Sequence, residues 1–140
     1  MRITGSDNGS INTLKKSATG RKLLEEAQRR GVNIQFKADN GDSTMGQYNP
    51  NNNTITVEQG NIEKMTEVLA HELVHATTKE NGNSMNEEKM AFIIGEKVSE
   101  EAGVNNTKHS DSYWNNHVNS AYSGLKNDNG IMNALAALDI

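Results

Sequence analysis

One segment of the sequence, His71-Glu72-Leu73-Val74-His75, has the residue types and spacing of a metal centre. Residues four apart lie on the same face of an α-helix, one turn from each other, so the imidazoles of His71 and His75 could bind one Zn²⁺ ion. Glu72 would then lie beside the metal, where its carboxylate could take a proton from metal-bound water. The five-residue pattern arises by chance in only about 1% of chains of this composition. We therefore predict a catalytic zinc site with Glu72 as its general base.

A catalytic zinc ion needs a third protein ligand and an open position for water. Two glutamates, Glu87 and Glu88, follow His75 on the next predicted helix. Glu87 lies nearer the middle of the apolar stripe of that helix, but it also completes a capping box that begins at Ser84. A capping box turns the glutamate carboxylate back to the N–H of its N-cap residue. The sequence therefore favours Glu88 as the ligand and keeps Glu87 as an alternative, with His109 a weaker candidate.

A tetrahedral intermediate formed by attack of metal-activated water would also need a hydrogen-bond donor that stabilises the negative charge on its oxygen. Tyr113 and His117 are four residues apart on the predicted helix that begins near residue 110, and His109 lies just before it. Each of these side chains could donate such a bond. We therefore predict Tyr113 and His117 as catalytic candidates together with Glu72.

The elements that must position these residues follow from hydrophobic periodicity. Apolar residues recur at spacings of three and four along residues 61–79 and 84–102, which predicts two helices, the first with Asn61 as its N-cap. Together with the other elements they predict an α+β fold, in which a small, mainly antiparallel sheet packs on the histidine helix, with additional helices. The other predicted elements are two helical segments within residues 10–30, separated near residues 17–20, a strand over 32–37, a loop over 39–44, a hairpin of 45–48 with 54–57, and helices beginning near residues 110 and 131.

The composition limits the size of the protein and its classes of partner. The chain has 140 residues, a net charge of −4 and few Leu, Ile, Val and Phe residues, which predicts one folded domain with a thin core. Cysteine is absent, which excludes disulfides and thiolate metal sites. Without a long apolar stretch or an apolar leader, we expect no membrane segment and no signal peptide, and hence a cytoplasmic monomer or one delivered by a signal-independent secretion route. Long runs of Lys or Arg are absent, which argues against nucleic acid as a partner.

The predicted ligands resemble those of the gluzincins, the group of zinc metallopeptidases that includes the thermolysin-like enzymes. The ligand helix of that family carries a glutamate, then a small residue three positions later, then a glycine four positions further on. Glu88, Ala91 and Gly95 reproduce this spacing, so the resemblance also implies Glu88 as a zinc ligand. The chain departs from the family at Phe92, where gluzincins often have an aspartate that orients a zinc-binding histidine.

Among gluzincins, the chain is most similar to small bacterial effector and toxin metallopeptidases of the NleD-like type. The similarity involves residues 17–24, 54–57 and 69–76. It implies a minimal zincin-like domain over residues 1–140 that hydrolyses peptide bonds in a protein or peptide substrate. In zincins a strand such as 54–57 forms the rim of the site, where its free edge pairs with the substrate. The alternative function is that of a catalytically silent metalloprotease-like domain that binds or senses a partner, which the phenylalanine at position 92 would suit.

Overall fold

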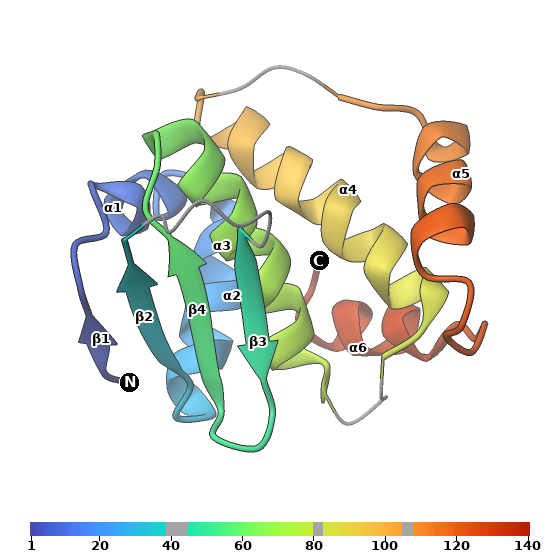
Figure 1. The fold of residues 1–140 in the computed structure, drawn as a ribbon, viewed down its shortest axis with the longest axis horizontal. Coiled ribbons are helices and arrows are strands. Elements are labelled where there is room, and N and C mark those ends of the chain that lie inside the picture. Colours follow the sequence, from blue (N-terminus) through green and yellow to red (C-terminus); the bar gives the residue numbers. More distant parts are fainter. Residues whose placement is uncertain (39–44, 80–82, 105–107) are drawn as a thin grey trace.

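The structure, a computed structural model, describes residues 1–38, 45–79, 83–104 and 108–140, and these form an α+β fold as predicted (Figure 1). Within these ranges, none of the helices combines the length and the apolar character needed to cross a membrane. The predicted loop over residues 39–44 lies outside the described residues. The strands are β1 (Ile3–Thr4), β2 (Asn33–Lys37), β3 (Gly46–Asn49) and β4 (Thr54–Glu58), and the helices are α1 (Ser10–Leu14), α2 (Ala18–Arg29), α3 (Ile62–Thr77), α4 (Met85–Glu101), α5 (Asp111–Ala121) and α6 (Gly130–Ala137).

The four strands form one mixed sheet in the order β1-β2-β4-β3. β3 and β4 form the predicted antiparallel hairpin, but β2 pairs with both β1 and β4 in parallel. The prediction of a mainly antiparallel sheet is therefore wrong. Alternation of apolar residues determines the buried face of a strand but not the direction of its neighbour, so it does not specify the parallel pairing of β2. The observed register places Ile34 beside Ile55 and Phe36 beside Val57, so all four apolar side chains share one buried face.

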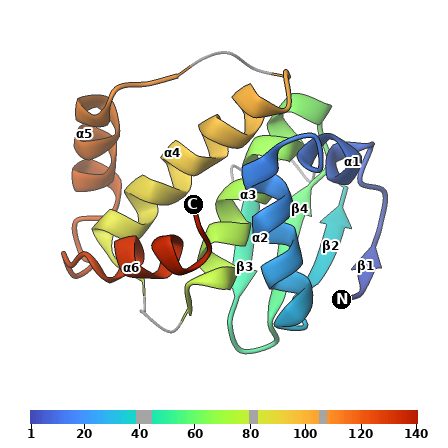
Figure 2. The same cartoon turned by 180° about the vertical axis from the view of Figure 1, so that it is seen from behind.

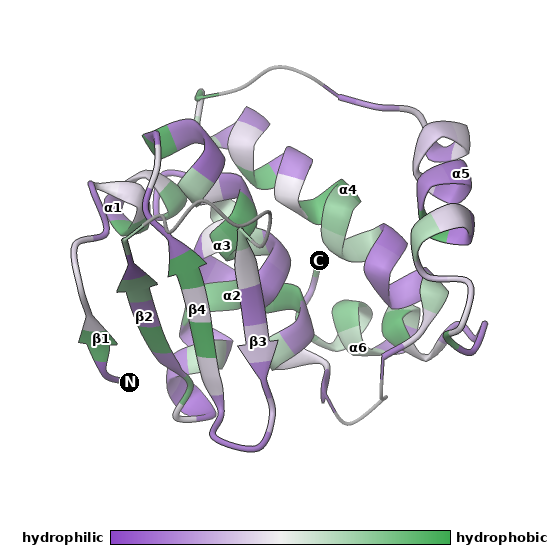
Figure 3. Ribbon diagram, in the orientation of Figure 1, coloured by the Kyte–Doolittle hydropathy of each residue, from purple (hydrophilic) through white to green (hydrophobic). Residues whose placement is uncertain are grey.

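Helices cover one face of this sheet and enclose the main core. Seen from behind, α1, α2 and α3 lie over the sheet (Figure 2). Apolar and polar residues alternate along β2 and β4, as expected for strands with only one covered face (Figure 3). The buried apolar side chains that the helices bring to the sheet include Leu23 and Leu24 of α2 and Met65, Leu69 and Leu73 of α3.

Side-chain caps fix where the helices begin. The Asn61 side chain accepts a hydrogen bond from the Lys64 N–H at 2.8 Å, so α3 begins where the sequence predicts. The break predicted within residues 10–30 is also confirmed. Ser17 caps α2 by accepting from the Gly20 N–H at 2.9 Å, so the break ends at Ser17 and residues 18–20 already belong to the helix.

α4 packs closely against α3, and a glycine makes this approach possible. A Cβ atom at Gly95 would lie 3.2 Å from the backbone oxygen of Glu67 and 3.9 Å from the Cβ of His71. The first distance is shorter than normal van der Waals contact, so any larger side chain would push the two helices apart. Gly95 therefore sets the separation between α3 and α4 beside the first histidine of the motif.

Replacing Gly95 with leucine is expected to destabilise the protein by about 1–3 kcal/mol, because the added side chain overpacks the contact between the helices. The loss should occur although leucine favours helices more than glycine does. Thermal unfolding should show a lower Tm for Gly95→Leu. The control, Lys97→Leu, lies at an exposed position of the same helix and should unfold like the wild type. An unchanged Tm in Gly95→Leu would contradict the tight contact.

Candidate metal centre

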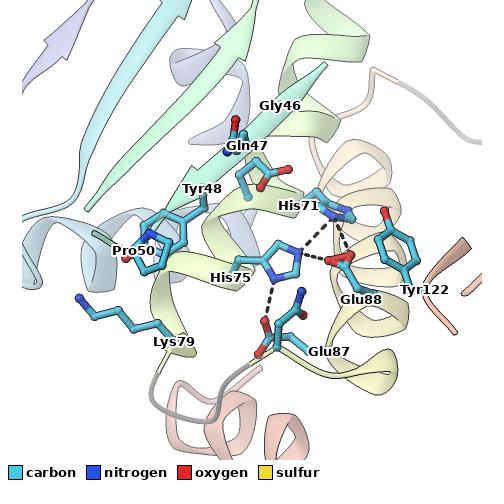
Figure 4. Close-up of a pocket in the computed structure, with 12 residues that line it drawn as sticks. Gly46, Gln47, Tyr48, Pro50, His71, His75, Lys79, Glu87, Glu88 and Tyr122 are labelled. Atoms are coloured by element: carbon cyan, nitrogen blue, oxygen red, sulfur yellow. Dashed lines mark hydrogen bonds and ion pairs between the residues drawn. The ribbon is translucent and has the colours of Figure 1, made fainter. Parts of the chain in front are cut away.

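Three predicted ligands converge where α3 faces the first turn of α4. His71 and His75 project from neighbouring turns of α3, and Glu88 projects towards them from α4 (Figure 4). The two Nε2 atoms are 3.3 Å apart. The Glu88 carboxylate lies 2.6 Å from Nε2 of His75 through one oxygen and 4.0 Å from Nε2 of His71 through the other. The structure therefore brings together the ligand set that the sequence favours.

The separation of the two histidines in this cluster matches that of two ligands on a tetrahedral metal ion. Ligand atoms about 2.0–2.1 Å from a tetrahedral zinc ion lie roughly 3.3 Å from each other. The separation between Nε2 of His71 and Nε2 of His75 matches this value, and the two distances from Glu88 fall on either side of it. Two imidazoles and one carboxylate suit Zn²⁺ and other borderline divalent ions. The cluster could therefore hold a catalytic metal with three protein ligands.

When no metal is bound, the pKa values of the two histidines shift in opposite directions. Burial lowers the pKa of His75, but hydrogen bonds to the carboxylates of Glu87 and Glu88 outweigh it and raise this pKa to about 10. Burial and the neighbouring charged His75 lower the pKa of His71 to about 3. At neutral pH the positive charge is therefore on His75, between two carboxylates.

Glu87 lies on the opposite side of His75 from Glu88. Its backbone N–H donates to the Ser84 side chain at 3.0 Å, as half of a capping box would. Its carboxylate does not turn back to Ser84 as predicted. It lies 2.7 Å from Nδ1 of His75 and accepts a hydrogen bond from the Thr78 hydroxyl at 3.2 Å. That part of the prediction is wrong because a buried imidazole is a closer partner for the carboxylate than the helix N-terminus.

Glu72, the predicted general base, is buried at the edge of the cluster. Its side chain is 8% exposed and lines two cavities. Burial raises its pKa to about 7, with a further contribution from the negative charge of Glu88. The positive charge of His75 and, to a smaller extent, a hydrogen bond from the backbone of Tyr48 lower this pKa. A carboxylate with a pKa near neutrality can both accept and release a proton at physiological pH.

Two cavities, of about 400 and 490 Å³, flank the cluster. Their linings share Gly46, His71, Glu72 and Tyr122, so the cavities meet beside His71 and Glu72. Gly46 lies on β3, and a side chain there would collide with Val68 of α3 and approach the Glu72 side chain. The glycine thus lets the edge of the sheet lie directly over the cluster.

Of the other candidates, His117 lies beside the cluster, whereas Tyr113 and His109 lie outside both cavities. His117 lines the second cavity, with its ring centroid 5.1 Å from that of Phe92. Tyr113 is 48% exposed, stacks on His109 at 4.1 Å and is not among the residues that line either cavity. Nδ1 of His109 lies 2.6 Å from the buried carboxylate of Glu96. The structure therefore does not bring Tyr113 or His109 to the ligand cluster.

Tyr122 is the site residue that the sequence analysis did not identify. It follows α5 in a non-helical conformation, and its side chain lines both cavities beside Glu88 (Figure 4). Burial and the charges of Glu88 and Glu72 raise its pKa, so the phenol stays protonated. Ser123-Gly124 directly after it is a helix-ending signal. That signal could have indicated that α5 ends before Tyr122, so that Tyr122 lies outside the helix that carries Tyr113.

Phe92 lies at the position where the sequence departs from the gluzincin pattern, which often has an aspartate there. Its ring contacts the edge of the His71 ring, with centroids 4.4 Å apart, and stacks on Trp114 at 4.5 Å. The Trp114 Nε1–H in turn donates to Glu96 at 2.6 Å, which ties α5 to α4. Phe92 and Tyr122 therefore form an aromatic wall beside the cluster, and Trp114 supports this wall by stacking on Phe92.

The protonated state of His75 predicts that metal binding depends on pH. With a pKa of about 10, this ring must lose the proton on Nε2 before it can bind a metal at pH 7. Zn²⁺ affinity should therefore rise about tenfold per pH unit from roughly pH 7 to 9. Calorimetry in two buffers with different ionisation enthalpies would measure the released proton. An affinity that does not change with pH would contradict the proton on His75.

Comparison of the chain with protein-family models, with curated proteins and with solved structures finds no match. The resemblance to gluzincins therefore rests on the spacing of residues in the sequence. The case for a metal centre rests on the positions of His71, His75 and Glu88, with Glu72 at their side.

Proposed function

We propose that this chain is a zinc-dependent metallopeptidase with a minimal zincin-like domain. The proposal is carried by one observation, the convergence of His71, His75 and Glu88 on a single point beside Glu72. Two histidines on one helical face, with a glutamate after the first, are typical of metalloproteases. Three protein ligands leave a fourth position for water, as a hydrolytic zinc site requires.

The residues of the cluster would divide the reaction between them. His71, His75 and Glu88 would hold the zinc ion, which when bound polarises the scissile carbonyl and lowers the pKa of its water. Glu72 would take the proton of the attacking water and pass it to the nitrogen of the leaving amine. The raised pKa of Glu72, about 7, suits both steps.

Tyr122 would stabilise the oxyanion of the tetrahedral intermediate. Its neutral hydroxyl can donate a hydrogen bond, and its side chain borders both cavities where they meet. His117 borders only the second cavity and is the less favourably placed donor. We therefore assign the oxyanion role to Tyr122 in preference to Tyr113 and His117.

The edge of β3 would bind the substrate as an extended strand. β4, the strand that the sequence analysis favoured for this role, is paired on both sides, with β2 and with β3. β3 pairs only with β4 among the described strands, and Gly46, Gln47 and Tyr48 line the first cavity. A peptide added to this edge would pass directly over the ligand cluster. The resemblance to bacterial effector and toxin enzymes suggests a protein of a target cell as the substrate.

Glu72→Gln tests the proposed mechanism. The amide cannot accept the proton of water, so cleavage should slow by at least about 100-fold while zinc binding persists. Zinc content by elemental analysis and digestion of an unstructured protein such as casein would measure both properties. Glu63→Gln, at an exposed position of the same helix, is the matched control and should cut like the wild type.

Two results would overturn the proposal in different ways. Full activity in Glu72→Gln with zinc bound would contradict the role of Glu72 as the base. A wild-type chain that binds zinc but cuts neither casein nor a mixed protein substrate would instead favour a silent binding domain.

Tyr122→Phe tests the oxyanion assignment. Loss of one donor to the developing charge should lower kcat about 100-fold with little change in KM, because the hydrogen bond strengthens only in the transition state. Steady-state kinetics on a fluorogenic peptide would show the difference. Tyr113→Phe removes a hydroxyl from a side chain outside both cavities and should leave kcat unchanged. Equal kcat in Tyr122→Phe and the wild type would exclude this role.

A further inference from the structure

His75 has a carboxylate on each of its ring nitrogens. Nε2 lies 2.6 Å from Glu88, and Nδ1 lies 2.7 Å from Glu87 (Figure 4). The two nitrogens point in opposite directions, so only Nε2 faces the point at which the ligands converge. Glu87 and Glu88 are neighbours in the sequence, yet they approach His75 from its two sides.

We propose that Glu87 is a positioning residue, which holds His75 with its Nδ1–H directed at the carboxylate and its Nε2 directed at the point where the ligands converge. The inference rests on the proposed function, because it concerns how the chain prepares a metal ligand. A carboxylate on the far nitrogen of a metal-binding histidine fixes the tautomer and the orientation of the ring and makes Nε2 a stronger base. Glu87 is thus not the third ligand, the alternative that the sequence left open.

The surroundings of Glu87 fit a fixed acceptor rather than a mobile ligand. The residue is 3% exposed, and the Thr78 hydroxyl donates to the carboxylate oxygen that does not face His75. Ser84 caps the helix at the Glu87 backbone N–H. The cap of α4 therefore fixes the backbone of Glu87, while His75 and Thr78, at the end of α3, hold its carboxylate.

The two histidines are positioned by different interactions. His71 packs edge-on against the ring of Phe92, at the position where related enzymes often carry an aspartate. His75 is held by the carboxylate of Glu87. Glu87 thus places a carboxylate on the far nitrogen of the second histidine rather than the first, and this arrangement distinguishes the site from the gluzincin pattern.

Zinc affinity of variants at position 87, measured by competition with a chromogenic chelator, tests the inference. Glu87→Ala should weaken binding about 10–100-fold. Glu87→Gln keeps an oxygen that can accept from Nδ1, so it should recover most of this loss. Glu88→Ala removes a ligand and should weaken binding far more than either. Glu100→Gln, on the exposed side of the same helix, is the matched control and should bind like the wild type.

A spectroscopic measurement separates positioning from a general loss of structure. In the zinc-loaded wild type, the ring NMR spectrum should show a His75 Nδ1–H signal that is shifted downfield and protected from exchange. The signal should persist in Glu87→Gln and disappear in Glu87→Ala, while the signals of the core remain. The near-isosteric Gln variant keeps the test valid even if Glu87→Ala unfolds.

Three outcomes would overturn the inference. Wild-type affinity in Glu87→Ala would show that the contact does not prepare the ligand. Loss of binding in Glu87→Ala as complete as in Glu88→Ala, with no recovery in Glu87→Gln, would make Glu87 a ligand. Absence of zinc binding in the wild type would overturn the proposed function as well, whereas the first two results leave that function standing.

Discussion

The packing of α4 across α3 is the contact on which the candidate site depends. One helix carries both histidines, and the other carries the two glutamates that face them. Gly95 sets the separation, since a Cβ atom there would already press on the backbone of α3. A metal held between His71, His75 and Glu88 would join the same two helices a second time, so folding and metal binding should be linked.

Local sequence patterns were sufficient to predict most elements of the fold but not the way in which the strands pair. Caps at Asn61 and Ser84 begin their helices where predicted, because a cap involves residues only three apart. Alternation correctly placed Ile34 and Phe36 in the core. It could not specify a parallel partner for β2, because parallel and antiparallel neighbours can bury the same face of a strand. β1 has only two residues, Ile3 and Thr4, too few for any periodicity.

In the site, too, local patterns predict some features, and the packing of the helices decides the others. The spacing of His71 and His75 within one helix indicates a shared face without any knowledge of tertiary structure. The position of the Glu87 carboxylate could not be predicted, because its competing partners, Ser84 and His75, lie on different helices and only their packing decides between them. Tyr122 reaches the cluster because α5 folds back beside α4, and no local pattern encodes that return.

The two walls of the site come from separate parts of the chain. The sheet wall, with Gly46 on β3, precedes the ligand helices in sequence. The aromatic wall combines Phe92 of α4 with Tyr122, which follows α5, and Trp114 of α5 stacks on Phe92. The buried carboxylate of Glu96, which accepts from the Trp114 Nε1–H, anchors that later segment away from the ligands. Under the proposed function, substitutions in α5 and its flanking residues could therefore change which substrate side chains bind in the cavities. The helices that carry the histidines and glutamates would stay constant. Substrate selectivity and metal binding would then depend on different segments of one small domain.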